Sequence, residues 1–314
     1  MTAEPDSSAP FDYDVVIVGG GPAGCSAGVF VARYGLETAI FDRGRSSIQR
    51  CAHLENYLGF PAGIDVETLY ALIHDHAETA GCERVSDLVE RVTRTGDEGS
   101  SERSGFVVET EQGTRVTTRR LVAATRYGGE YLRGLDEEDA MFESYEYDGE
   151  EREKFDREYA EANGTTPIEG LYVASPSAES DTQAIIAAGR GARVGINVVE
   201  DARRAQGYPD SVANYYDWVR REEELEDEWQ DRNRWERFFD ERIPEDHDFE
   251  EVTRLEIRDG EIDRRLEQYI DRSDRARRRL RGQERLLEHV DDERILEAAR
   301  EITADRETDS STIG

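Results

Sequence analysis

The sequence predicts an α/β fold with a parallel β-sheet, followed by an α-helical C-terminal extension. First, Val15 to Val18 form an unbroken apolar run, the pattern of a parallel strand that is covered on both faces. Second, a glycine-rich turn follows this run and leads into a helix predicted over Ala23 to Tyr34. Third, from about Gly207 the chain becomes highly charged, with aromatic residues at helical spacing. We therefore expect a sheet-based domain followed by helices.

The glycine turn has the spacing of a dinucleotide-binding loop. Gly19, Gly21 and Gly24 stand in a GxGxxG pattern. In this Rossmann-like pattern the first glycine allows a tight turn, the second lets the backbone approach a diphosphate, and the third lets the helix pack closely on the sheet. The amides at the helix N-terminus would face the phosphates. A chance glycine turn in another α/β fold is the alternative interpretation.

A second strand, predicted over Leu36 to Phe41, ends in an acidic residue. Asp42 follows Gly24 by 18 residues, a place where a carboxylate can accept hydrogen bonds from ribose hydroxyls. The residues alone leave FAD and NAD open as the dinucleotide, because both share this turn.

Four stretches of the sequence are similar to one known family. They are DVVIVGGGPAG at 14–24, FDRG at 41–44, ENYLGFP at 55–61 and GLYVASPSAESDTQAIIAAGRGARVGINVVED at 170–201. They resemble the FAD domain of thioredoxin-reductase-like flavoproteins, and the resemblance covers residues 11–125 and 168–205. ENYLGFP discriminates, since many other flavoproteins share the glycine turn but not this segment. The resemblance implies a Rossmann-like FAD-binding domain with a parallel sheet, and FAD as the cofactor.

The resemblance also implies which residues bind FAD. Asp42 and Arg43 would lie at the adenosine end, Asn56 near the ribityl chain, and a helix from about Gln183 would point its positive end at the flavin ring. The spacing of Ser180 and Gln183 fits a capping box, which we favour for Ser180 over a cofactor contact. The implied diphosphate contacts are Gly19, Gly21, Pro22, Ala23 and Gly24.

The chain departs from the family in three places. The stretch 126–167 is acidic and has no second glycine turn, so it cannot house the NADPH domain that the family inserts there. No CxxC pair is present. The family motif ATG reads AATR at 123–126, and its Gly-Asp reads Ser175-Pro176. Loss of that carboxylate removes a charge-assisted hydrogen bond to the ribityl chain, worth about 1.5–3 kcal/mol.

Cys51 is the weak candidate for thiol chemistry near the flavin. Arg50 and His53 flank it, and basic neighbours lower the pKa of a thiol. The alternative is a buried or incidental thiol. Cys25 and Cys82 are expected to be small core residues. No catalytic acid or base is predicted.

The charge of the chain is strongly negative. Seventy-two acidic and 40 basic residues give a formal net charge of −32, and Lys154 is the only lysine. This composition resembles that of proteins from salt-accumulating halophiles, where molar salt shortens the Debye length to about 3 Å. We expect structure to be lost in dilute buffer, where these charges repel one another. The same charge argues against nucleic acid as a partner.

Nothing in the sequence predicts a membrane, secreted or metal-binding protein. No apolar run approaches the ~20 residues of a membrane span, and the first ten residues lack the pattern of a signal peptide. Three cysteines without evident pairing agree with a reducing cytoplasm. His74 and His76 are expected to be exposed on different sides of a helix, whereas metal-ligand pairs stand four residues apart.

The C-terminal third predicts helices and one short strand. Trp218, Leu225 and Trp229 have the spacing of one helical stripe. Residues 249–257 alternate as a strand would and end at the turn pair Asp259-Gly260. The predicted organisation is a flexible N-terminus (1–10), an FAD-binding domain (11–206) with a short insert at about 126–167, a helical extension (207–304) and a disordered tail (305–314).

These observations favour an FAD-dependent oxidoreductase of the thioredoxin-reductase-like superfamily. Its electron donor and acceptor are unknown small molecules or protein redox partners, and reduction of thioredoxin itself is not expected. We interpret the extension as a helical annex of the FAD domain, with a lid or a homodimer surface as alternatives. A non-catalytic or degenerate dinucleotide-binding or interaction protein, or an NAD-binding Rossmann protein, is the rival interpretation.

Overall fold

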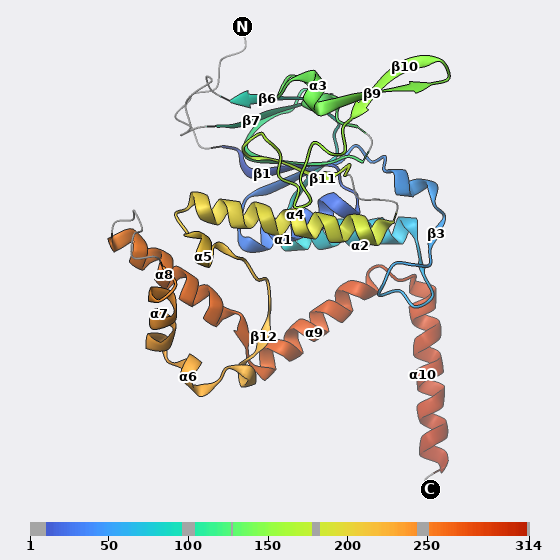
Figure 1. The fold of residues 1–314 in the computed structure, drawn as a ribbon. Coiled ribbons are helices and arrows are strands. Elements are labelled where there is room, and N and C mark those ends of the chain that lie inside the picture. The colour runs from blue at the N-terminus through green and yellow to red at the C-terminus, as the bar shows by residue number, and fades with distance from the viewer. Residues whose placement is uncertain (1–10, 96–103, 127, 178–182, 244–250, 313–314) are drawn as a thin grey trace. The chain divides into compact units, whose positions relative to one another are not determined.

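The computed structural model describes residues 11–95, 104–126, 128–177, 183–243 and 251–312 (Figure 1). The chain divides into two compact units, Met1–Asp217 and Trp218–Gly314. Each unit is described by itself below.

The first unit contains a seven-stranded sheet with the order β5-β2-β1-β8-β7-β6, in which β11 also pairs with β8. The parallel strands are β1 (Tyr13–Val18), β2 (Thr38–Phe41), β5 (Glu83–Val85), β8 (Arg115–Ala124) and β11 (Leu171–Ser175). The antiparallel strands are β7 (Gly105–Thr110) and β6 (Val89–Thr95). The predicted α/β class with a parallel sheet is confirmed.

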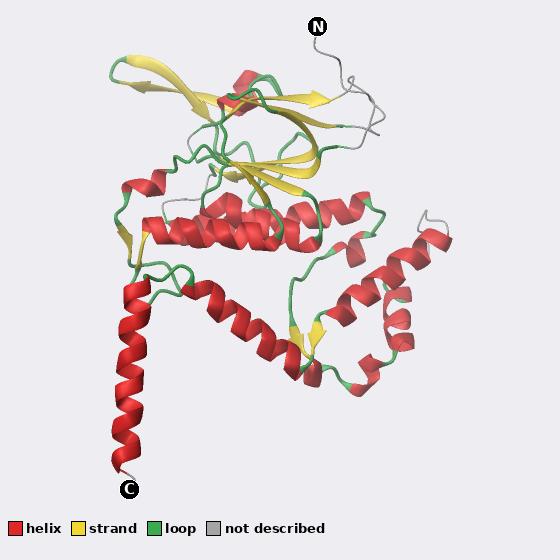
Figure 2. Ribbon diagram, turned by 180° about the vertical axis from the view of Figure 1, so that it is seen from behind, coloured by secondary structure: helices red, strands yellow, loops and turns green. Residues whose placement is uncertain are grey.

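Helices cover one face of this sheet (Figure 2). They are α1 (Pro22–Tyr34), α2 (Val66–Ala80) and α4 (Ala184–Ala205), with the short α5 (Asp210–Ala213) after them. Val15 and Ile17 of β1 belong to the core under these helices, whereas Val16 and Val18 belong to the core on the opposite face. All four are at most 5% exposed, which explains why the run is apolar without alternation.

Glycines let α1 and α4 approach at backbone distance. A Cβ atom at Gly191 would lie 2.0 Å from the carbonyl oxygen of Ala23, and one at Gly195 would lie 2.7 Å from that of Ala27. Both distances are shorter than a real Cβ atom tolerates. Close packing of these two helices therefore requires that positions 191 and 195 carry no side chain.

The predicted insert forms a β-hairpin. After η3 (Glu130–Leu132) and α3 (Glu138–Met141), β9 (Phe142–Tyr147) pairs with β10 (Glu150–Phe155) in antiparallel register. Phe142 and Phe155 meet edge to face, 5.7 Å between ring centroids, and both are buried. The described residues of 126–167 thus form a hairpin anchored to the core, and no second nucleotide-binding sheet is present among them.

The second unit is mainly helical. Its elements are β12 (Arg220–Arg221), η4 (Glu222–Glu224), α6 (Asp227–Gln230), α7 (Arg232–Asp240), α8 (Glu251–Glu267), β13 (Tyr269–Ile270), α9 (Arg272–Leu287) and α10 (Asp292–Thr312). The core of α6 and α7 is an aromatic cluster in which the rings of Trp229 and Trp235 lie 4.5 Å apart. Phe239 stacks on Trp235 in the same cluster.

Two sequence predictions for this unit are wrong. Residues 251–257 lie in α8 rather than in a strand, and Asp259-Gly260 continues the helix. Arg254 and Arg258, one turn apart, both reach the carboxylate of Asp240 on α7, a tertiary contact that alternation in the sequence cannot reveal.

The second error concerns the stretch from Trp218 to Trp229. It does not form one helix, because β12 and η4 interrupt it before α6. Toward the C-terminus, α10 continues to Thr312. Among the described residues, no helix combines the length and the apolar character needed to cross a membrane.

Candidate functional site

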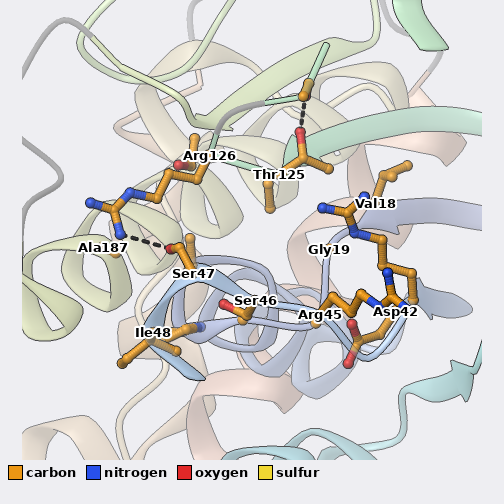
Figure 3. Close-up of a pocket in the computed structure, with 18 of the residues that line it drawn as sticks. Val18, Gly19, Asp42, Arg45, Ser46, Ser47, Ile48, Thr125, Arg126 and Ala187 are labelled. Carbon is orange, nitrogen blue, oxygen red and sulfur yellow. Dashed lines mark hydrogen bonds between the residues drawn. The ribbon is translucent and has the colours of Figure 1, made fainter. Parts of the chain in front are cut away.

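A cavity of about 990 Å³ lies where β1, β2 and β8 end, at the size expected for a large small-molecule site (Figure 3). The short elements η1 (Ser47–Arg50) and β3 (His53–Leu54) contribute to its lining, and β3 pairs with β4 (Ile64–Asp65). Eight of the nine residues predicted to hold the cofactor line it: Gly19, Gly21, Pro22, Ala23, Asp42, Arg43, Asn56 and Gln183. The structure therefore brings together residues from segments far apart in the sequence.

The glycine turn has the geometry that a dinucleotide needs. Gly19 has a φ of +117°, and a Cβ there would lie 2.3 Å from the carbonyl oxygen of Ala124. Gly24, the ninth predicted residue, is buried, and a Cβ on it would lie 1.8 Å from the Gly19 oxygen, so it sets the contact between turn and helix. Gly21 has no backbone atom this close, and it is the N-cap of α1 without a side-chain cap. The first amides of α1 are thus directed toward the cavity without a side chain above them.

Asp42 lies at the same edge of the sheet and is only 7% exposed. Its Oδ1 accepts a hydrogen bond from the Gly44 amide at 2.9 Å, and its Oδ2 lies 3.4 Å from His74 Nε2. Each carboxylate oxygen offers two acceptor positions, so Asp42 retains capacity for a ribose hydroxyl.

His74 was missed by the sequence analysis. The prediction that it is exposed is wrong, since its side chain is 17% exposed and its Nε2 lies 2.9 Å from the carbonyl oxygen of Gly20. It therefore links α2 to the glycine turn and to Asp42. No local pattern reveals this contact, because α2 reaches the turn only through the folded sheet. His76, by contrast, is exposed as predicted.

Asn56 and Gln183 meet in the cavity lining. Asn56 Nδ2 donates a hydrogen bond to Gln183 Oε1 at 2.8 Å, so two residues chosen separately from the sequence form one pair. Gln183 is the N-cap of α4, and the helix begins where predicted. The predicted capping box placed Gln183 in the first turn, which is wrong, and Ser180 and Asp181 lie outside the described residues.

The three cysteines are free thiols in different environments. Cys25 is buried, and its Sγ lies 3.2 Å from the Gly20 carbonyl oxygen. Burial raises its pKa well above the usual range and raises the pKa of Cys82 to about 12. Both are core residues, as predicted. Cys51 is exposed and lines the cavity, so it is the thiol that a ligand could meet.

The end of β8 contributes a residue that the sequence analysis treated only as a departure from the ATG motif. Arg126 has a φ of +61°, a conformation that favours glycine. Its guanidinium lines the cavity, and Nη1 donates a hydrogen bond to Ser47 Oγ at 2.7 Å (Figure 3). An arginine at a glycine position of the family motif was the signal available in the sequence.

Comparison with known proteins shows which proteins part of this chain is similar to. Residues 13–142 match the family model described as pyridine nucleotide-disulphide oxidoreductase. The thioredoxin reductase of Streptomyces clavuligerus is 30% identical over 132 residues, which cover 41% of this chain and 38% of that protein. The thioredoxin reductase of Bacillus subtilis is 37% identical over 73 residues, 23% of each chain. The chain thus spans about two fifths or less of the length of these relatives.

Solved structures agree on the fold. A thioredoxin reductase from Gloeobacter violaceus superposes with a TM-score of 0.50 at 17% sequence identity, over 66% of this chain and 98% of that chain. The first unit therefore has a Rossmann-like fold similar to that of the FAD-binding thioredoxin reductases, and residues 13–142 are similar in sequence to pyridine nucleotide-disulphide oxidoreductases. The cofactor of these proteins is FAD.

The residues present fit that cofactor. The open approach to Gly21 accommodates a diphosphate, because the nearest atoms to a Cβ there are hydroxyl oxygens, Ser46 Oγ at 3.4 Å and Tyr70 Oη at 3.6 Å. The Tyr70 hydroxyl is buried without a hydrogen-bond partner among the described residues. Asp42 and the Asn56–Gln183 pair add polar groups to the lining of the same cavity.

Proposed function

We propose that the protein is an FAD-dependent oxidoreductase that passes electrons between a donor and an acceptor, and that no nicotinamide-binding domain is inserted between its two FAD-binding segments. The observation that supports this best is the single cavity that joins the glycine turn, Asp42 and the Asn56–Gln183 pair. When bound, FAD supplies two-electron redox chemistry. The protein binds it, orients it and limits the access of water.

The hairpin β9–β10 bears on the identity of the electron donor. Because the described insert is a hairpin rather than a second nucleotide-binding sheet, the described residues of the first unit offer no second domain for a nicotinamide. A protein redox partner such as a reduced ferredoxin is therefore the proposed donor. Since the sequence has no CxxC pair, thioredoxin is not the proposed acceptor.

Anaerobic reduction tests this proposal. FAD-loaded protein in molar KCl would be mixed with reduced ferredoxin or with NADPH, and the visible absorption of the flavin would be followed. We expect rapid bleaching with ferredoxin and slow bleaching with NADPH. A flavin that neither donor reduces would favour the rival proposal of a non-catalytic FAD-binding protein.

Cys51 is the proposed thiol for any transfer beyond the flavin, because it is the exposed cysteine of the cavity wall. Replacement by serine should leave flavin reduction intact and abolish reduction of a disulfide acceptor. The matched control is Cys82→Ser, since Cys82 is buried. Equal activity of the Cys51 variant and the wild type would remove Cys51 from the mechanism.

The cellular setting is likewise a proposal. A net charge of −32 with one lysine supports a halophile-like cytoplasm, and the three free thiols agree with a reducing compartment. We also propose that nucleic acid is not a partner. Whether the protein forms a homodimer would be tested by measuring its molar mass by light scattering in molar KCl.

A further inference from the structure

The carbonyl oxygen of Gly20, in the middle of the glycine turn, is held by two side chains that lie outside the cavity. It is 2.9 Å from His74 Nε2 and 3.2 Å from Cys25 Sγ. Gly20 and Gly21 line the cavity, whereas neither His74 nor Cys25 belongs to the described residues that do. The oxygen is therefore directed away from the cavity, toward the packed helices behind the turn.

Both side chains act as donors to this oxygen. His74 Nε2 faces two acceptors, the Gly20 oxygen and, at 3.4 Å, Asp42 Oδ2, so this nitrogen must carry the ring proton. Burial raises the pKa of the Cys25 thiol, which therefore stays protonated and donates its S–H. The His74 ring also packs edge to face on Tyr70, one helical turn earlier, with 5.3 Å between ring centroids.

The direction of this carbonyl group fixes the direction of the next amide. The Gly20–Gly21 peptide bond is trans, and in a trans peptide the C=O group and the following N–H group point in opposite directions. With the Gly20 oxygen turned toward His74 in α2, the Gly21 N–H is turned toward the cavity that Gly21 lines.

The Gly21 amide is open to a ligand. Among the described residues it donates no hydrogen bond, and the N-terminus of α1 has no side-chain cap at this position. An amide of this kind at the start of a helix is suited to a phosphate oxygen. The orientation of the Gly20–Gly21 peptide therefore decides whether the turn presents this donor to the diphosphate of a dinucleotide.

We propose that His74 is a positioning residue for the ADP part of FAD. Through the Gly20 oxygen it turns the Gly21 amide toward the diphosphate, and through Asp42 Oδ2 it orients the carboxylate that accepts the ribose hydroxyls. Cys25 supplies the second contact to the same carbonyl group. His74 itself does not touch the cofactor. This inference rests on the proposed function, because it takes FAD as the ligand.

The experiment measures binding to the apo protein rather than activity. FAD, ADP and riboflavin would be titrated in molar KCl, because ADP has the diphosphate and ribose without the flavin and riboflavin has the flavin without the diphosphate. The variants are His74→Leu, which removes the donor, and His74→Gln, whose side-chain amide can donate in place of Nε2. The control is His76→Leu, an exposed histidine of the same helix. Circular dichroism and thermal unfolding establish that each variant is folded.

We expect His74→Leu to bind FAD and ADP about 5- to 20-fold more weakly, because the Gly20 carbonyl loses a donor and the Gly21 amide is no longer held toward the cavity. Riboflavin affinity should not change. His74→Gln should recover most of the lost affinity, and the control should behave as the wild type does. A merely structural role for His74 would lower the unfolding temperature without a loss confined to FAD and ADP.

Three outcomes overturn the inference. The first is wild-type affinity for FAD and ADP in folded His74→Leu, the second is an equal loss of riboflavin affinity, and the third is a His74→Gln variant as weak as His74→Leu. If riboflavin binds the wild type too weakly to measure, recovery by glutamine decides. Failure of the proposed function is a separate result, in which the wild type binds FAD but no donor reduces it. If the wild type binds ADP but not FAD, the ADP affinities decide, and binding of neither ligand also overturns the inference.

Discussion

Replacing Gly191 by alanine tests how closely α4 must approach α1. The new Cβ would lie 2.0 Å from the carbonyl oxygen of Ala23 and 2.7 Å from its carbonyl carbon. Both are backbone atoms, so no side-chain rotation relieves the overlap. The helices must separate by about 1 Å to reach the shortest contacts that real Cβ atoms make.

The magnitude follows from two opposing effects. Overpacking a core costs about 1–3 kcal/mol, and a clash with backbone belongs at the upper end. Alanine is favoured over glycine inside a helix by about 1 kcal/mol. The net loss for Gly191→Ala is therefore about 2 kcal/mol. For a unit of this size that corresponds to a fall of roughly 4–8 °C in the unfolding temperature.

Gly189 provides the matched control on the same helix, because nothing lies within 4 Å of its Cβ position. Gly189→Ala should gain up to about 1 kcal/mol and unfold roughly 2–4 °C higher than the wild type. Thermal unfolding in molar KCl measures both variants. The reasoning is refuted if Gly191→Ala is as stable as Gly189→Ala, since the two glycines would then not differ in packing.

Three further predictions concern thiols, a buried cation and salt. A thiol reagent at about pH 8 should label one cysteine per native chain, because Cys51 alone among the three is exposed. Burial raises the pKa of Cys82 to about 12 and also raises the pKa of Cys25, so both thiols stay protonated. Fast labelling of a second thiol would contradict the burial of Cys25 and Cys82. Arg190, buried in α4, donates hydrogen bonds to carbonyl oxygens of β11 at 3.0 and 3.3 Å. Arg190→Met should therefore lower the free energy of unfolding, measured in urea, by about 3 kcal/mol. A variant as stable as the wild type would argue against these hydrogen bonds. Dialysis to low salt should reduce the helical circular dichroism signal because of the −32 charge, and an unchanged spectrum excludes this view.

The parts of the fold that the sequence predicted correctly are those governed by local chemistry. The apolar run of β1, the glycine turn and the start of α1 each follow from backbone constraints within a few residues. Asn56 and Gln183 were located through a family resemblance, and their hydrogen bond brings them together in the wall of one cavity.

The features of the fold and the site that the sequence did not predict depend on contacts between segments far apart in the chain. His74 contacts Gly20 only because α2 packs beside the glycine turn, and Arg126 reaches Ser47 only because the end of β8 faces η1. In the second unit, α8 is helical where Arg254 and Arg258 reach Asp240, although its sequence alternates locally. Periodicity carries no information about such partners.

The central claim is that the glycine turn, with Asp42 beside it, holds an adenine dinucleotide through its diphosphate. Calorimetric titration of the folded apo protein with FAD in molar KCl tests this directly. One FAD bound per chain, with micromolar or tighter affinity, is the predicted result. A folded protein that produces no binding heat and leaves flavin fluorescence unchanged would contradict it.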